Sequence, residues 1–209
     1  MLEKYPEKKD EILEVLKRNG NRLQRLTADI LDVTRIESQT LKLNKEQLNL
    51  NDVILSIVED NKNEVEKRYH GKVKLLFEPK EDRIAIKVDK NRLSQVLSNL
   101  INNAIKFTKE GTITFDVERR NSSSNNKNSN DDNEDKDVIV SVRDTGTGID
   151  PEILPRLFSK FATKSETGTG LGLYISKSII EAHGGRIWAE NYEYDGKKGA
   201  VFAFSLPLK

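Results

Sequence analysis

The sequence of 209 residues contains no cysteine and only two histidines. Without cysteine, the chain cannot carry a disulfide framework, a thiol nucleophile or a cysteine-based zinc or iron–sulfur site. Two histidines are too few for a histidine-rich metal cluster. No run approaches the roughly 18 consecutive apolar residues of a membrane-spanning helix, so we expect no membrane segment in this chain. The first residues are too charged for a signal peptide.

The chain also has no large excess of positive or negative charge. Thirty-five Lys and Arg residues against 34 Asp and Glu residues give a formal net charge of +1, so nothing in the charge balance indicates a nucleic-acid partner. Hydrophobic residues make up 35% of the chain; with glycine they reach about 41%, below the ~45–50% of typical domains. Part of the chain therefore lies outside a packed core, and the length fits one domain plus an appendage.

Residues 10–37 are expected to form a long helix, because Leu16, Leu23 and Ile30 recur every seven residues. This heptad seam favours contact with another helix, in a dimer or a bundle. The alternative is an amphipathic helix packed on its own domain. Gly20 weakens the middle of the helix by about 1 kcal/mol relative to alanine, so a kink or break there is an open alternative.

The remaining elements interleave without a regular strand–helix–strand rhythm, which predicts an α/β (α+β) two-layer sandwich with helices on one face of a mixed sheet. Residues 121–137 contain no apolar side chain, so we expect a disordered hairpin loop there. Asn51 and Asp89 are the expected helix N-caps. Predicted helices span 51–69, 90–107 and 171–183, and predicted strands span 73–77, 84–88, 113–117, 138–142, 186–191 and 201–205.

One face of the predicted helix 90–107 carries Gln95, Asn99, Asn103 and Lys106, spaced four, four and three residues apart. Asparagine competes with the helix backbone for hydrogen bonds, so its repetition in an apolar helix needs a reason. Its amide oxygen is a neutral ligand suited to Mg²⁺, and Lys106 could approach a phosphate. The alternative is an ordinary solvated face, since Asn102 shows that this helix also tolerates asparagine elsewhere.

A second motif, Asp144-Thr-Gly-Thr-Gly-Ile149, follows a strand of alternating valines. A carboxylate in that place can accept a hydrogen bond from an exocyclic amine such as that of adenine. Gly146 and Gly148 would let a flat ring approach the backbone. The alternative is a plain turn rich in glycine and aspartate.

A third motif, the glycine-rich run 168–173, leads directly into a predicted helix. Backbone N–H groups at such a helix start can hold phosphates. The pattern is neither a Walker A loop nor a dinucleotide-binding fingerprint, so alone it is a weak signal.

The segment 157–165 precedes this run and places Phe158 and Phe161 beside Lys160 and Lys164. Two aromatic residues beside lysines predict a hinge and a lid that faces phosphates, and residues 160–170 are expected to form a mobile loop. The alternative is a hydrophobic anchor beneath a loop.

In this order, the stretches NRLSQVLSNLINNAIKFT, DTGTGID, LFSKFATKS and GTGLGLYISK resemble the N, G1, F and G2 boxes of sensor histidine kinases. These kinases belong to an ATPase superfamily that also holds DNA gyrase, Hsp90 and MutL. The resemblance covers about Asn49–Lys209, and four ordered motifs make it far more specific than any one of them. It implies an ATP-binding Bergerat fold.

By this resemblance, Asp144 would hold the adenine amine and Asn103, with Asn99 nearby, would coordinate Mg²⁺. Asn99 and Lys106 would be the catalytic residues. Asn99 stands where gyrase-like ATPases carry a glutamate that activates water, and an amide cannot act as a general base, which favours transfer to a histidine over hydrolysis. The implied nucleotide-binding set is Asn99, Asn103, Lys106, Asp144, Gly146, Gly148, Ile149, Phe158, Lys160, Thr163, Lys164, Gly168, Thr169, Gly170, Leu171 and Gly172.

Residues 12–44 resemble the second helix of the kinases' dimerisation and phosphotransfer unit. We therefore expect a partial unit at 1–45 and an ATP-binding catalytic domain at 46–209. His70 is followed by Gly-Lys and His183 by Gly-Gly, whereas the family's acceptor histidine precedes an acidic residue and soon after Ser/Thr-Pro. Both are expected to be structural helix-end residues, and the acceptor is expected on an upstream helix outside this chain.

The function predicted from the resemblance is transfer of the ATP γ-phosphate to that histidine in a two-component system. Expected partners are the upstream acceptor helix, a response regulator and a second copy in a full-length homodimer. The expected location is cytoplasmic, with membrane tethering of the parent protein left open. Two alternatives remain: a non-catalytic ATP-binding or dimerisation module of the same superfamily, and an ATP-driven clamp, which would need a water-activating glutamate near Asn99.

Overall fold

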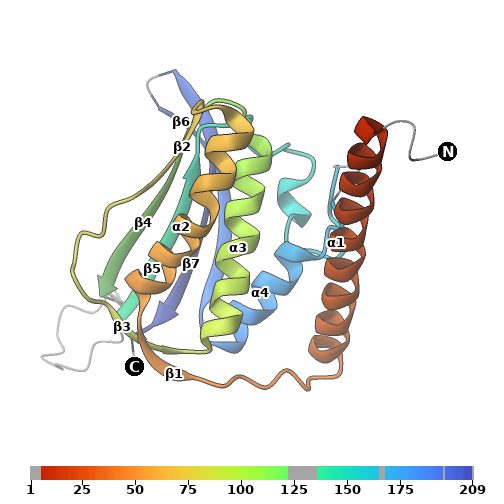
Figure 1. Cartoon of the computed structure of the whole chain (residues 1–209). Helices are drawn as coiled ribbons and strands as arrows, with labels where there is room; N and C mark the ends of the chain where they lie inside the picture. Colours follow the sequence, from red (N-terminus) through yellow and green to blue (C-terminus); the bar gives the residue numbers. More distant parts are fainter. Residues whose placement is uncertain (1–5, 122–135, 165–167, 195, 209) are drawn as a thin grey trace, which may run out of the picture. The chain divides into compact units, whose positions relative to one another are not determined.

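The computed structural model describes residues 6–121, 136–164, 168–194 and 196–208 (Figure 1). The chain divides into two compact units, Met1–Leu41 and Lys42–Lys209. In the first unit, the helix α1 runs from Pro6 to Glu37 without interruption. The break considered at Gly20 does not occur, because the helix continues after it from Asn21 to Glu37. Its seam residues Leu16, Leu23 and Ile30 are each more than half exposed.

The second unit is built on a five-stranded mixed sheet. The strand order is β2-β4-β5-β7-β6, in which β2 and β4 run parallel and the other neighbours run antiparallel. The strands are β2 (Val73–Phe77), β4 (Gly111–Asn121), β5 (Lys136–Asp144), β6 (Arg186–Tyr194) and β7 (Lys197–Pro207). Two short strands, β1 (Glu46–Asn49) and β3 (Ala85–Val88), form a separate antiparallel pair.

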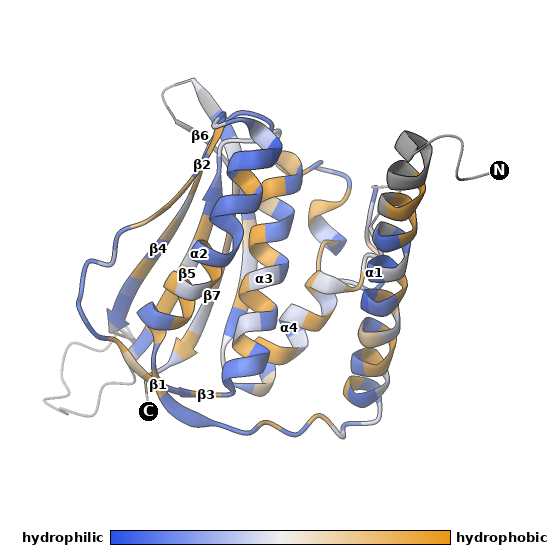
Figure 2. Cartoon of the chain, viewed as in Figure 1, coloured by the Kyte–Doolittle hydropathy of each residue, from blue (hydrophilic) through white to orange (hydrophobic). Residues whose placement is uncertain are grey.

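Three helices, α2 (Leu50–Tyr69), α3 (Lys90–Phe107) and α4 (Gly172–Ala182), cover one face of this sheet (Figure 1). A short 3₁₀ turn, η2 (Leu154–Arg156), precedes α4. The core lies between the layers. Along α3, Leu93, Val96, Leu97, Leu100 and Ile101 are at most 1% exposed, and their helical spacing forms the apolar stripe visible in Figure 2. The predicted two-layer fold with helices on one face is confirmed.

Local sequence signals placed most element ends, with one correction at the start of α2. The helix is capped by Asn49 and not by Asn51, because the Asn49 side-chain oxygen accepts from the backbone N–H groups of Asn51 (3.3 Å) and Ile84 (3.1 Å). Asn51 is buried inside the first turn. The α3 cap is as predicted, since Asp89 accepts from the N–H of Arg92 at 3.1 Å.

The β4–β5 hairpin extends further than its sequence suggests. Asn121 pairs with Lys136, and Arg120 pairs with Asp137, so the strands continue into the segment 121–137 that was expected to be disordered. Ladder hydrogen bonds satisfy the backbone there despite the lack of apolar side chains. The rest of that predicted loop, 122–135, lies outside the described residues.

Candidate functional site

The polar stripe of α3 faces the start of α4. The Asn99 amide nitrogen donates to the carbonyl oxygen of Gly172 at 3.1 Å and to the Ser176 hydroxyl at 3.2 Å. Asn99 is therefore held against α4 and does not belong to a solvated face. Both bonds use Nδ2. The amide oxygen Oδ1 therefore remains as a neutral atom that can bind a cation beside the glycine-rich start of α4.

Two further stripe residues follow along the same helix. Asn103 lies one turn beyond Asn99 and is half-buried. Burial lowers the pKa of the Lys106 ammonium, which lies 5.5 Å from the centre of the Phe107 ring. A partly desolvated cation gains from an anionic ligand, so Lys106 suits a phosphate contact.

The strand β5 ends at Asp144, a carboxylate that is only 2% exposed. Its Oδ1 accepts from the N–H groups of Gly146 (2.9 Å) and Ala200 (3.4 Å). Burial raises the pKa of Asp144, and these two hydrogen bonds offset part of that rise. Both bonds end on Oδ1, so Oδ2 takes no part in either of them. A buried carboxylate with a perturbed pKa is a candidate functional group.

Glycine is required at two positions of the loop 144–149. A Cβ on Gly146 would run into the carbonyl of Phe107 at the end of α3. Gly148 has φ +75°, and a Cβ there would lie 2.9 Å from Asn191 Oδ1. The loop is thus packed between α3 and β6, which is more than the plain turn considered from the sequence.

Sequence reasoning missed two residues that contact this loop. Asn191 bonds twice to Ile149, accepting from its N–H at 2.6 Å and donating to its carbonyl at 2.7 Å. The Tyr192 hydroxyl donates to the Asp144 carbonyl at 2.8 Å. No local pattern indicates these contacts, because more than 40 residues separate the partners along the chain.

The glycine-rich segment before α4 contacts the lid segment through its backbone. Gly170 has φ +67°, and a Cβ there would lie 2.5 Å from the carbonyl carbon of Phe161. The Thr169 hydroxyl accepts from the N–H of Leu171 at 3.2 Å, and the buried Leu171 anchors the start of α4 at Gly172. Gly168 precedes them in the same described stretch. This segment exposes backbone near a helix N-terminus, as anion binding requires.

The lid segment 158–164 carries the aromatic and cationic residues. Phe161 has φ +62°, a left-handed conformation that is uncommon for a bulky residue, and it is 69% exposed. The Lys160 ammonium lies 5.3 Å from the centre of the Tyr174 ring on α4. Phe158 is half-buried and Thr163 is exposed. Residues 165–167 of the predicted lid lie outside the described residues.

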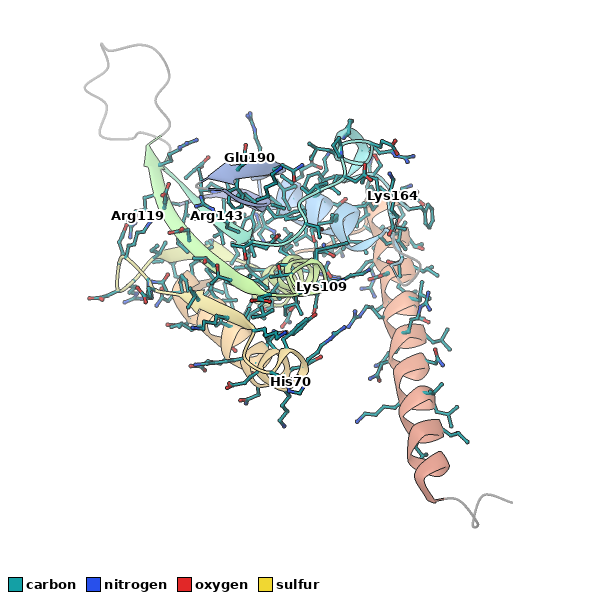
Figure 3. All side chains as sticks on the ribbon, turned by 90° about the horizontal axis from the view of Figure 1, so that it is seen from above. His70, Lys109, Arg119, Arg143, Lys164 and Glu190 are labelled. Atoms are coloured by element: carbon teal, nitrogen blue, oxygen red, sulfur yellow. The ribbon has the colours of Figure 1, made fainter. Side chains whose placement is uncertain are left out.

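The Lys164 side chain (Figure 3) contacts two carboxylates. Its Nζ lies 2.6 Å from Asp150 Oδ2 and 2.6 Å from Glu152 Oε2. Hydrogen bonding to Asp150, and then to Glu152, raises the pKa of Lys164. The expectation that Lys164 faces phosphates therefore stays a prediction, and it requires this ammonium to leave its present partners.

The two histidines differ in setting. His70 is the exposed C-cap of α2, with φ +50°. His183 is 5% exposed at the end of α4. Its Nε2 accepts from the Asp89 N–H at 3.0 Å, so Nδ1 carries the proton and donates to the Ile179 carbonyl at 2.8 Å. Both occupy helix ends, as predicted, and burial lowers the pKa of His183.

The residues present fit magnesium only with help from a ligand. Within the described ranges, no group of three or more His, Asp and Glu side chains is placed to hold a metal ion. The Asn99 amide lies at the start of α4, and Mg²⁺ characteristically combines few protein ligands with substrate phosphates and water.

None of the helices in the described residues combines the length and the apolar character of a membrane-spanning segment.

Comparison with known proteins agrees with this arrangement. The family model for histidine kinase-, DNA gyrase B-, and HSP90-like ATPases matches residues 88–209, which is more than half of the chain. The chain belongs to this family. It is 32% identical over 207 residues to the sensor protein KdpD of Clostridium acetobutylicum, covering 96% of this chain and 21% of that protein. The chain spans well under half the length of the curated relatives it matches.

Two solved structures are similar over nearly the whole chain. Full-length ShkA in complex with AMPPNP is 26% identical, with a TM-score of 0.72 over 95% of this chain and 38% of that one. The histidine kinase ThkA in complex with the response regulator protein TrrA is 30% identical, with a TM-score of 0.67 over 98% of this chain and 52% of that one. Both neighbours extend beyond the part that this chain matches.

Proposed function

We propose that the unit 42–209 binds Mg-ATP, with the adenine amine donating to Asp144 Oδ2. The observation that carries this proposal is the buried carboxylate at the end of β5, whose Oδ1 is fixed by two N–H groups while Oδ2 takes no part in either bond. Gly146 and Gly148 let the loop after Asp144 pack closely against Phe107 and Asn191, which fixes the backbone beside the carboxylate.

The phosphates would extend from there toward the start of α4, where Asn99 of α3 is bonded to Gly172. The amide oxygens of Asn103 and Asn99 would complete the shell of a Mg²⁺ ion that also binds phosphate oxygens. Bound Mg²⁺ neutralises phosphate charge. Lys106, Lys160, Lys164 and Thr163 would contact the phosphates from α3 and the lid, and the N–H groups of 168–172 would cap them.

The reaction we propose is transfer of the γ-phosphoryl group to a histidine. An imidazole nitrogen of the acceptor attacks the γ-phosphorus in line, the bond to the bridging oxygen breaks, and ADP leaves with the electron pair. Catalysis of this kind is mostly positioning and charge neutralisation. Asn99 supports transfer over hydrolysis, because its amide cannot deprotonate water.

Neither histidine of this chain is placed as the acceptor. His183 is buried with both ring nitrogens bonded to backbone groups, and His70 caps α2. We place the acceptor on a helix outside this chain. The unit that contains α1 would pair with that helix and with a second copy in the full-length protein, because its heptad residues are exposed. A response regulator would receive the phosphoryl group, by analogy with ThkA and TrrA, and the cytoplasm would be the location.

The test is a phosphotransfer assay with labelled ATP and a separate fragment that carries a dimerisation unit with its acceptor histidine. Wild type should label the fragment, and Asn103→Ala should bind Mg-ATP more weakly and label it more slowly. Nucleotide binding without labelling would support the non-catalytic module instead. Steady release of free phosphate without labelling would favour the ATP-driven clamp.

A further inference from the structure

The two ends of the loop 144–149 are held by two consecutive residues of β6. Tyr192 bonds to the backbone of Asp144 at the start of the loop, and Asn191 bonds to the backbone of Ile149 at its end. Three hydrogen bonds of 2.6–2.8 Å therefore fix the distance between the ends of the segment that carries the adenine-binding carboxylate.

The contact at Ile149 is unusual for an exposed side chain. The Asn191 amide pairs with both the N–H and the carbonyl of Ile149, as a neighbouring strand would. The contact comes from the side chain, while the backbone of Asn191 is opposite Ala200 on β7. Ala200 in turn donates to Asp144 Oδ1, so the same cross-strand pair reaches both ends of the loop.

The contact at Asp144 is supported from two sides. The ring of Tyr192 lies 5.3 Å from the guanidinium carbon of Arg143, which is labelled in Figure 3. A Cβ on Gly199 would run into the Asp144 carbonyl and lie 3.0 Å from the Tyr192 ring. Glycine at position 199 therefore leaves room for the Tyr192 hydroxyl to reach the Asp144 carbonyl at the start of the loop.

We propose that Asn191 and Tyr192 are positioning residues that set the affinity and base selectivity of the nucleotide site by fixing the loop 144–149. This inference rests on the proposed function, because it assigns a role at the same site. The mechanism is preorganisation: a loop held open at the correct width loses less conformational entropy when the base binds.

The structure offers closely matched controls. The Tyr69 hydroxyl donates to the Ile105 carbonyl at 2.8 Å, and its ring lies 5.5 Å from the guanidinium carbon of Arg68. Tyr69→Phe therefore removes the same kind of bond as Tyr192→Phe, but it does so between α2 and α3. Asn61 donates to the Ile57 carbonyl at 2.8 Å on α2 and is the control for Asn191.

The experiment measures the dissociation constants of Mg-ATP and Mg-GTP by calorimetry, together with thermal unfolding. Asn191→Ser removes both bonds to Ile149, and Asn191→Asp keeps the acceptor but places a carboxylate oxygen against the Ile149 carbonyl. We expect ATP to bind about 5- to 10-fold more weakly to each Asn191 variant and to Tyr192→Phe, as loss of about one hydrogen bond predicts. In these variants, the ratio of the Mg-GTP dissociation constant to the Mg-ATP dissociation constant should be smaller than in wild type. Tyr69→Phe and Asn61→Ser should bind ATP like wild type.

The failure of this inference is distinct from the failure of the proposed function. If wild type binds no ATP, the proposed function fails and the inference fails with it. If wild type binds but the Asn191 and Tyr192 variants bind equally well, only the inference is overturned. It is also overturned if the control variants weaken binding to the same extent, because the effect would then follow general stability.

Discussion

The two ends of the candidate site differ in how firmly they are built. At the proposed adenine end, Asp144 is 2% exposed, and the loop 144–149 is bonded to β6, β7 and the end of α3. At the phosphate end, Phe161 is 69% exposed in a left-handed conformation and Lys164 is bonded to surface carboxylates. The comparison indicates that the loop proposed to bind adenine is already fixed without ligand. If the proposed function holds, the cations at the proposed phosphate end would have to rearrange when nucleotide binds.

The largest effect should come from Asp144→Asn at the adenine end. The amide nitrogen would oppose the adenine amine, donor against donor, so we expect Mg-ATP to bind about 10- to 150-fold more weakly, as loss of a hydrogen bond to a charged group predicts. The variant should also unfold at a higher temperature, because a buried charge is removed. Calorimetry and thermal unfolding test both effects.

Asp116→Asn is the control for this change, because that carboxylate lies on the same sheet with its side chain 38% exposed and paired to Lys80. It should leave ATP affinity unchanged. Equal binding by wild type and Asp144→Asn would show that the adenine end lies elsewhere.

At the phosphate end, the sharpest change is Gly170→Ala. The new Cβ would meet the Phe161 backbone at 2.5 Å while the residue is forced into φ +67°, so we expect about 10-fold weaker ATP binding and a loss of roughly 1–3 kcal/mol of stability. Gly71→Ala is matched, since φ is +76° but nothing lies within 4 Å. Gly71→Ala should lower the stability without changing the affinity for ATP. If both variants lost ATP affinity to a similar extent, the contact between Gly170 and Phe161 would have no specific role in binding.

The pH dependence of stability tests the end of α4 opposite the phosphate loop. Burial lowers the pKa of His183 below its usual 6.5; the nearby charge of Lys45 lowers it further, while Asp89 opposes this. The unfolded chain therefore binds a proton that the folded chain does not, so the free energy of unfolding falls as pH drops below about 6.5. Urea unfolding from pH 7.5 to 5.5 measures this slope.

His183→Gln should remove that part of the slope. The raised pKa of Asp144 acts in the opposite sense, favouring the folded state at lower pH, and it is common to wild type and the variant. A slope unchanged by His183→Gln would show that protonation does not disturb this helix end.

The smallest effect should follow from freeing Lys164. The double variant Asp150→Asn/Glu152→Gln removes both negative partners of its ammonium, so we expect ATP to bind about twofold more tightly at low salt, with the gain lost at high salt because exposed ion pairs are weak and screened. Glu181→Gln, which removes the surface partner of Lys177, is the control. Weaker binding by the double variant would mean that the carboxylates support the site directly.

Much of the unit 42–209 could be predicted from the sequence because its signals are local. The cap residue Asp89 and the apolar spacing that follows it identify α3 from neighbouring residues alone, and alternating valines identify β5 up to Asp144. The motifs at Asn99, Asp144 and Gly170 could likewise be named from their order along the chain, and their family is confirmed. Their individual roles in nucleotide binding stay predictions.

Only the tertiary structure decided how these pieces meet. The sequence favoured Asn51 as a cap, but pairing of β1 with β3 brings Ile84 to Asn49 and makes Asn49 the cap. Asn191 and Tyr192 were missed because their partners lie in the loop 144–149, more than 40 residues away along the chain. Helical and strand periods arise from backbone geometry that a few adjacent residues determine, whereas these contacts depend on sheet register and helix packing, which are set by the whole core at once.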